Sequence, residues 1–150
     1  GSPREAEVSM VARDIEIAKK TGAIVNIQHI SCKETAQMIR EAKQAGYTNI
    51  HGEATPHHFT LTQEDAIKHG TMAKMNPPLR SKEDLDALIE GLNDGTLTVI
   101  ATDHAPHTQT AKLEEFDHAP FGIVGLETAF SICYTLNNRC YTTKFQGFLL

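Results

Sequence analysis

The sequence predicts an α/β fold with a parallel sheet, and three observations lead to that class. Segments whose apolar residues recur about every 3.6 positions alternate along the chain with short runs rich in β-branched residues. Strands that alternate with helices in this way form parallel sheets with right-handed crossovers. No glycine-rich phosphate-binding motif follows any predicted strand, which argues against a nucleotide-binding sheet. A doubly wound sheet and part of a (β/α)8 barrel both fit this pattern.

The predicted elements begin and end at recognisable sequence signals. Helices are expected over residues 5–20, from Ser31 to Gly46, from Thr62 to about Gly70, from Ser81 to Gly95, and over residues 126–136. Strands are expected over residues 23–27, 49–55, 72–75 and 97–101. Ser31, Thr62 and Ser81 are each followed three positions later by Glu or Asp, which is the spacing of a capping box. A loop of about 18 residues precedes the last helix.

Composition limits the classes of function. The chain has 150 residues, 40% of them hydrophobic, and a formal net charge of −5, so we expect one globular domain without a broad nucleic-acid surface. No apolar run is long enough for a transmembrane helix, and residues 1–10 lack a secretory signal. The three cysteines, Cys32, Cys133 and Cys140, form no C-x-x-C pair. We therefore expect a cytoplasmic protein that binds neither nucleic acid nor a membrane.

Polar side chains follow the carboxyl ends of the predicted strands. His29, His57, Asn76 and Asp103 each lie at or just after such an end, and in a parallel sheet these ends open on one edge. Each residue alone is equally typical of a core histidine, a solvated loop or a turn cap. Together, two histidines and an aspartate match the ligands of zinc or manganese. The pattern predicts a hydrolytic metal site with a carboxylate able to move a proton.

Five motifs carry a resemblance to a known family. They are His29-Ile30-Ser31, Thr55-Pro56-His57-His58, Asn76-Pro77-Pro78-Leu79-Arg80, residues 101–107 (ATDHAPH) and residues 121–128 (FGIVGLET). In this order they resemble the dihydroorotases of the bacterial type found as a separate chain, in the amidohydrolase superfamily. The resemblance runs from about Pro3 to about Leu136. The Asn-Pro-Pro-Leu-Arg motif and the residues 121–127 point to dihydroorotase more narrowly than the Thr-Asp-His motif does.

The resemblance implies a metal site. His29 and His57 would be zinc ligands at the ends of the fifth and sixth barrel strands. Asp103 would be both a ligand and the general acid/base at the end of the eighth strand, and His58 would support the site. One or two zinc ions are implied.

The resemblance also implies a reaction and a substrate site. The reaction is the reversible cyclisation of N-carbamoyl-aspartate to dihydroorotate in pyrimidine biosynthesis. Asn76 and His107 would contact the substrate, and the backbone of Phe121 and Gly122 would close over its ring.

The sequence departs from the family pattern in its metal ligands. It contains no His-x-His pair, and the bridging acidic residue or carboxylated lysine of the fourth strand is also absent. A complete barrel needs about 250 residues, so residues 1–136 are expected to form its second half, strands five to eight, with residues 137–150 as an unassigned tail. We expect such a chain to be incomplete and inactive alone.

Exposed strand edges also suggest that the chain pairs with a second copy of itself. The resemblance leaves a neighbouring transcarbamoylase open as another partner. Two other functions stay open. One is another cyclic amidase, such as allantoinase or dihydropyrimidinase, and the other is a non-catalytic dihydroorotase-like partner of the transcarbamoylase.

Overall fold

A computed structural model describes residues 2–139 of the chain. Helices and strands alternate over most of this length, as predicted. In chain order the elements are α1 (Arg4–Thr21), β1 (Val25–Ile27), α2 (Lys33–Gln44), β2 (Ile50–Ala54), α3 (Gln63–His69), η1 (Gly70–Ala73), α4 (Lys82–Asn93), β3 (Val99–Ile100), α5 (Gln109–Lys112) and α6 (Leu126–Arg139).

The described strands form a parallel sheet in the order β1-β2-β3. Val25 pairs with Ile50 and Glu53 pairs with Val99, with the strands parallel in both pairs. The predicted parallel α/β class is therefore confirmed.

The strand expected over residues 72–75 is wrong. Residues Gly70–Ala73 form a 3-10 turn, and the Lys74 N–H closes it by donating to the Thr71 carbonyl. The Lys74 carbonyl accepts from the Gly122 N–H at 3.0 Å rather than from a neighbouring strand. The backbone groups of this segment therefore form hydrogen bonds within a turn and with a distant loop. As a result β2 pairs directly with β3.

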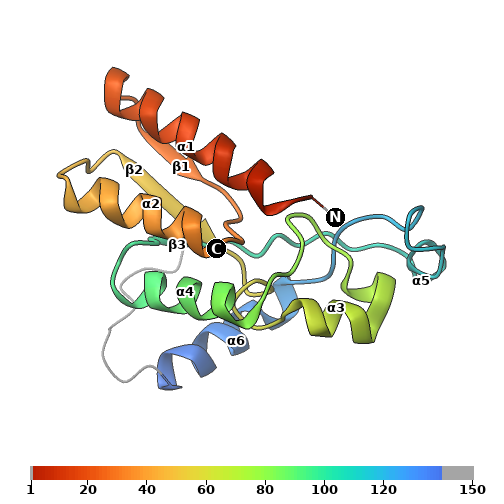
Figure 1. Ribbon diagram of the computed structural model, residues 1–150. Helices are drawn as coiled ribbons and strands as arrows, with labels where there is room; N and C mark the ends of the chain where they lie inside the picture. Colours follow the sequence, from red (N-terminus) through yellow and green to blue (C-terminus); the bar gives the residue numbers. More distant parts are fainter. Residues whose placement is uncertain (1, 140–150) are drawn as a thin grey trace.

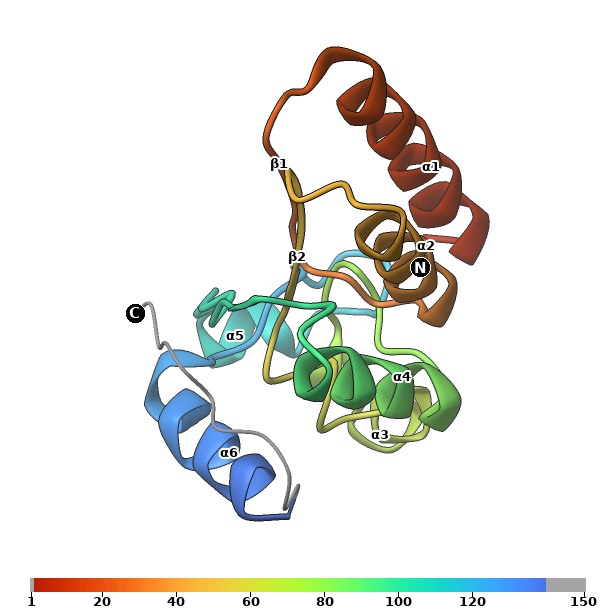
Figure 2. The ribbon, with the colours of Figure 1, turned by 90° about the vertical axis from the view of Figure 1, so that its left-hand side faces the viewer.

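Three helices cover one face of the sheet. α1 packs on α2 and α2 packs on α4, so the three lie side by side in Figure 1. Figure 2 views β1 and β2 nearly edge-on, with α1, α2 and α4 on the same side of them. Between the layers lies the main apolar core, formed by residues such as Ile15, Ile39, Ile50, Leu88 and Leu97, with Cys133 added by α6.

The opposite face of the sheet is polar. Side chains alternate between the two faces of a strand, so the neighbours of Ile27 and Ala54 point away from the core. Asn26 and Glu53 meet on this face, where the Asn26 amide donates to the Glu53 carboxylate at 3.4 Å. A polar interior face is where a site that binds a polar ligand can form.

Local capping signals are confirmed at two helices and wrong at the third. The capping boxes that begin with Thr62 and Ser81 are both present. The expected box at Ser31 does not form, because α2 begins one residue later, after Cys32. The carboxylate of Glu7, on α1, accepts from the Ser31 and Cys32 N–H groups at 3.1 and 3.0 Å. A long-range acceptor has replaced the local one.

A buried carboxylate ties three helices together near the same end of the sheet. Asp84, at the start of α4, accepts from both terminal nitrogens of Arg4 on α1, at 2.7 and 2.6 Å. It also accepts from the Lys33 N–H at the start of α2, at 2.9 Å, and from the Ser81 hydroxyl, at 2.7 Å. Burial alone favours the neutral acid, but these donors outweigh it and hold the pKa of Asp84 far below its usual range.

Two features lie beyond the expected elements. A short helix, α5, occupies part of the long loop, and α6 continues three residues past its predicted end at Leu136. Residues 140–150 of the predicted tail lie outside the described residues. None of the helices in the described part of the chain is both long enough and apolar enough to cross a membrane.

Candidate functional site

Two of the predicted metal ligands meet at the carboxyl end of the sheet. His29 follows β1 and Asp103 follows β3, and the His29 Nε2 lies 3.7 Å from the Asp103 Oδ1. Both residues have a positive φ, 50° for His29 and 47° for Asp103. Side chains other than glycine adopt this backbone rarely, and they do so mostly where a functional group must be aimed. The sheet thus brings together two residues that are 74 positions apart in the sequence (103 − 29).

A buried glutamate that was not predicted contacts the ring nitrogen of His29 that does not face Asp103. Glu53, on β2, places its Oε1 2.8 Å from the His29 Nδ1 and accepts from the His29 N–H at 3.3 Å. The Nδ1 of His29 makes no hydrogen bond with that oxygen in this arrangement, although the two atoms are in close contact. Carboxylates on the far nitrogen of a histidine commonly orient metal ligands. The sequence signal that could have identified Glu53 is an acidic residue within the strand predicted over residues 49–55.

His57, the third predicted ligand, is buried beside the segment that carries Asp103. Its Nε2 has no hydrogen-bond partner. Burial lowers the pKa of His57 below its usual range, and the nearby backbone of Asp103 and Thr102 offsets part of that effect. Gly125 makes room for the ring, because a Cβ at that position would lie 2.9 Å from the His57 Cε1 and 2.4 Å from the Thr102 carbonyl. His57 therefore presents a neutral, unpartnered imidazole nitrogen, as a metal ligand does.

His58, which was expected to support the metal site, contacts the loop that carries Asn76 and Pro77. Its Nδ1 lies 2.7 Å from the Thr55 hydroxyl and its Nε2 lies 2.9 Å from the Pro77 carbonyl. Burial lowers the pKa of His58 to about 4, so the ring is neutral at pH 7. It fixes the residue that follows Asn76. Asn76 and His29 line the same cavity of about 250 Å³.

The residues predicted to bind substrate are also connected to this edge of the sheet. The His107 Nε2 lies 2.8 Å from the Phe121 carbonyl. Gly122 has a φ of 119°, and a Cβ there would lie 2.6 Å from the Ala105 side chain. Only glycine therefore lets this segment lie so close to the residues that follow Asp103. The Gly122 N–H reaches back to the Lys74 carbonyl, two residues before Asn76.

The donor atoms fit part of a zinc site. Zinc bonds of about 2.0–2.1 Å in a tetrahedral arrangement place neighbouring ligand atoms about 3.4 Å apart, and the His29–Asp103 separation is 3.7 Å. The unpartnered His57 nitrogen is a further donor of the right type. However, no three His, Cys, Asp or Glu side chains within residues 2–139 are arranged closely enough to hold a metal ion. The structure therefore brings two candidate donor side chains, His29 and Asp103, close together, with the His57 nitrogen as a third candidate.

Curated proteins that carry the name dihydroorotase share more than half of the matched sequence. A dihydroorotase of Clostridioides difficile (strain 630) is 58% identical over 135 residues, which cover 90% of this chain and 32% of that protein. A dihydroorotase of Caldanaerobacter subterraneus subsp. tengcongensis is 55% identical over 135 residues, or 31% of its length. No protein-family model matches the chain. These identities confirm the resemblance seen in the motifs.

Solved structures share the fold. The chain superposes on a D-hydantoinase (dihydropyrimidinase) from Thermus sp. with a TM-score of 0.83 and 28% identity, covering 94% of this chain and 32% of that one. A dihydroorotase from Saccharomyces cerevisiae in complex with 5-fluoroorotic acid gives a TM-score of 0.80 over 93% of this chain and 41% of the other. At 16% identity, the latter supports the fold alone. Over 135 residues the chain is therefore a homologue of bacterial dihydroorotases, and it spans about a third of their length.

Proposed function

We propose that this chain forms part of the active site of a zinc-dependent dihydroorotase. In this proposal His29, His57 and Asp103 are metal ligands, and Asn76, His107, Phe121 and Gly122 form the substrate side. The observation that carries it is the 3.7 Å approach of the His29 imidazole to the Asp103 carboxylate, on two residues with left-handed backbone.

In the proposed mechanism each of these groups has its own role. Zinc, when bound, supplies a Lewis acid that lowers the pKa of water toward neutrality. In the hydrolytic direction Asp103 accepts the proton of the attacking water and returns it to the ring nitrogen as the ring C–N bond breaks. Glu53 keeps the His29 ring in place, and the Phe121–Gly122 segment holds the substrate beside Asn76. In the direction of synthesis the same proton moves the opposite way.

The chain is proposed to correspond to the second half of the barrel, strands five to eight, within residues 1–136. The sequence contains no His-x-His pair, so residues 1–150 by themselves are proposed not to turn over dihydroorotate. A cytoplasmic location is consistent with Cys32 and Cys133, which are both buried and unpaired.

Dihydroorotase is favoured over the other cyclic amidases by sequence. The chain is 58% identical to a dihydroorotase over 135 residues. It is 28% identical to a dihydropyrimidinase on which it superposes with a TM-score of 0.83. A shared fold carries many activities, whereas the higher identity over 135 residues supports a shared substrate. We therefore place dihydroorotate before dihydropyrimidine or allantoin.

The test compares two single-histidine variants in the protein at its full natural length. His57→Ala is expected to lower the zinc content and to reduce dihydroorotate hydrolysis at least 100-fold. His69→Ala removes an exposed histidine at the end of α3 and is expected to leave both unchanged. Full zinc content in the His57→Ala variant would show that this ligand assignment is wrong. Hydrolysis of dihydropyrimidine or allantoin but not dihydroorotate would replace the proposed substrate, and no turnover of any of the three by folded protein would favour the non-catalytic partner.

A further inference from the structure

Two buried lysines lie beside the segment that carries Phe121 and Gly122. Lys112, on α5, is 4% exposed and Lys74, just after η1, is 6% exposed. Within residues 2–139 neither ammonium group has a carboxylate within ion-pair distance. Burying a cation without a counter-ion is costly, so its hydrogen bonds must compensate. The partners of these two groups therefore show what the lysines hold.

The hydrogen-bond partners of the Lys112 ammonium group are backbone carbonyls of two segments. Its Nζ donates to the Gly122 carbonyl at 2.9 Å, to the Pro120 carbonyl at 3.1 Å and to the Lys74 carbonyl at 3.2 Å. An ammonium group has three protons, so all three are used. One side chain thus joins the Phe121–Gly122 segment to the residues that lead to Asn76.

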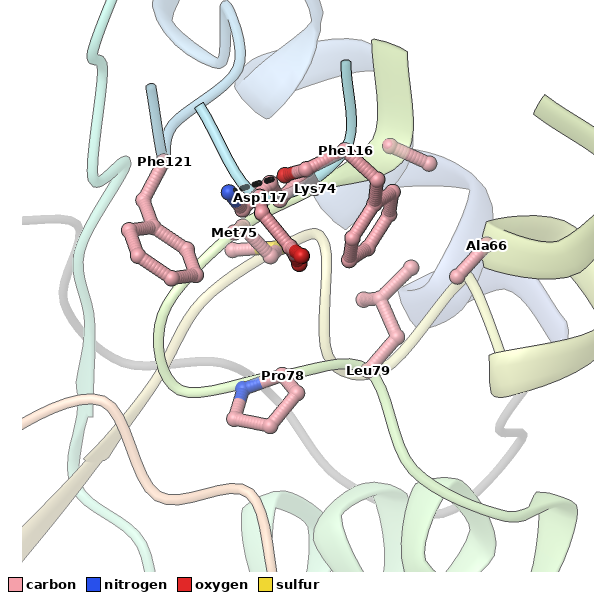
Figure 3. A pocket seen from close by; sticks show the side chains of 9 residues that line it. Ala66, Lys74, Met75, Pro78, Leu79, Phe116, Asp117 and Phe121 are labelled. Atoms are coloured by element: carbon pink, nitrogen blue, oxygen red, sulfur yellow. Dashed lines mark hydrogen bonds between the residues drawn. The ribbon is translucent and has the colours of Figure 1, made fainter. Parts of the chain in front are cut away.

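Lys74 binds the same loop from the other side. Its Nζ donates to the Phe116 carbonyl at 2.5 Å and to the Ala119 carbonyl at 2.7 Å. The same ammonium lies 4.3 Å from the centre of the Phe121 ring and 5.1 Å from that of Phe116, as Figure 3 illustrates. These are cation–π distances. The two lysines together hold the loop from Phe116 to Gly122.

Apolar packing does little to hold this loop. The Phe121 and Phe116 side chains are 51% and 50% exposed, and a cavity of about 200 Å³ lies between them (Figure 3). A half-exposed ring over an open cavity gains only part of the hydrophobic stabilisation of a core residue. Polar contacts therefore contribute much to the position of the loop: the lysine hydrogen bonds, the contact of the His107 ring with the Phe121 carbonyl and the bond from the Gly122 N–H to the Lys74 carbonyl.

We propose that Lys112 is a positioning residue for substrate binding, which acts by fixing the Phe121–Gly122 segment against the Asn76 segment through the carbonyls of Pro120, Gly122 and Lys74. The expected effect on substrate binding rests on the proposed function. The role of Lys112 in fixing the Phe121–Gly122 segment does not. Lys112 does not touch the substrate in this account. Its loss loosens the segment that does, so it is expected to weaken substrate binding more than it slows the chemical step.

The test uses Lys112→Met in the protein at its full natural length. Methionine keeps most of the unbranched side chain and removes the charge and all three donors. We expect KM for dihydroorotate to rise about tenfold, kcat to change less than threefold, and the zinc content to stay at the wild-type value. Lys112→Arg, which keeps a cationic donor, is expected to recover at least half of the loss in kcat/KM. Lys68→Met, at an exposed position on α3, is the control and should behave as the wild type.

Amide hydrogen exchange provides a readout that does not depend on activity. In the wild-type protein the Gly122 amide should exchange at least 100-fold more slowly than an amide in an unfolded chain. The reason is that it donates to the Lys74 carbonyl, which also accepts from the Lys112 ammonium group. In Lys112→Met that protection should fall at least tenfold. Exchange of Gly122 at the open-chain rate in the wild type would overturn the inference without any variant.

The two proposals fail in different ways. A wild-type protein that does not hydrolyse dihydroorotate would refute the proposed function, while the exchange experiment would still decide whether Lys112 fixes the loop. An active wild type together with a folded Lys112→Met variant whose KM is within twofold of wild type would refute the positioning role alone.

Discussion

Replacing Asp84 by asparagine is expected to weaken the hydrogen bonds and the ion pair that join α4 to α1 and α2. Its side chain is 1% exposed and accepts from four groups: Arg4, the Lys33 N–H, the Ser81 hydroxyl and the Ser81 N–H. Asparagine keeps the shape but removes the charge and turns one acceptor oxygen into a donor. The Arg4 contacts and one further bond are then lost or weakened.

The structure sets the size of the effect. Loss of one partner of a buried ion pair costs about 3–5 kcal/mol, and the Arg4 side chain is 32% exposed, so water compensates for part of the loss. We expect Asp84→Asn to lower the free energy of unfolding by about 3 kcal/mol. Asp86→Asn, on the same helix, breaks only an exposed pair with Lys82 and should cost less than about 0.5 kcal/mol.

Urea denaturation followed by circular dichroism measures both variants, and pH gives an independent check. The pKa of Asp84 is lower in the folded state than its ordinary value of 3.8. The stabilisation is therefore complete above about pH 4 and is lost as the pH falls toward the folded-state pKa. The difference between wild type and Asp84→Asn should be constant from neutral pH to about pH 5 and shrink below about pH 4. A loss below about 1 kcal/mol, or a loss equal to that of Asp86→Asn, would refute the reasoning.

Two further predictions concern the sheet. Glu53→Gln removes the charge behind His29, and loss of such an orienting carboxylate typically lowers metal affinity about 10- to 100-fold; competition with a zinc chelator measures it, and an unchanged affinity would contradict the orienting role of Glu53. Gly52→Ala places a Cβ 2.8 Å from the side chains of Ile30, Ile39 and Leu97, so overpacking should destabilise the fold by about 1–3 kcal/mol. Thermal melting measures this change, and a wild-type melting temperature would show that the core can relax around the methyl group.

Local patterns were enough to predict most of the elements. The amphipathic spacing of Leu85, Leu88 and Leu92 predicts a helix, and these residues are buried in α4 as expected. The capping boxes at Thr62 and Ser81 form because each needs only residues three positions apart. The order of helices and strands then predicts the parallel sheet, because a crossover helix between two adjacent strands permits little else.

The errors arose where a distant group replaced a local partner. Ser31 has the spacing of a capping box, but Glu7 of α1 supplies the acceptor instead. Residues 72–75 are apolar enough for a strand, but the Lys74 carbonyl is taken by Gly122 and Lys112. No local pattern contains this information, because hydrogen bonds between segments depend on the folded arrangement.

The α/β class, the residues that follow each strand and the family resemblance could all be predicted from sequence, because periodicity, capping and motifs are properties of neighbouring positions. Three contacts became visible only in the folded chain: His29 and Asp103 approach to 3.7 Å, Glu53 lies beside the other ring nitrogen of His29, and Lys112 joins the loop at Gly122 to the segment at Lys74. The physical reason is that buried charges find their partners across the fold rather than along the chain, and a partner far away in sequence leaves no periodic signal.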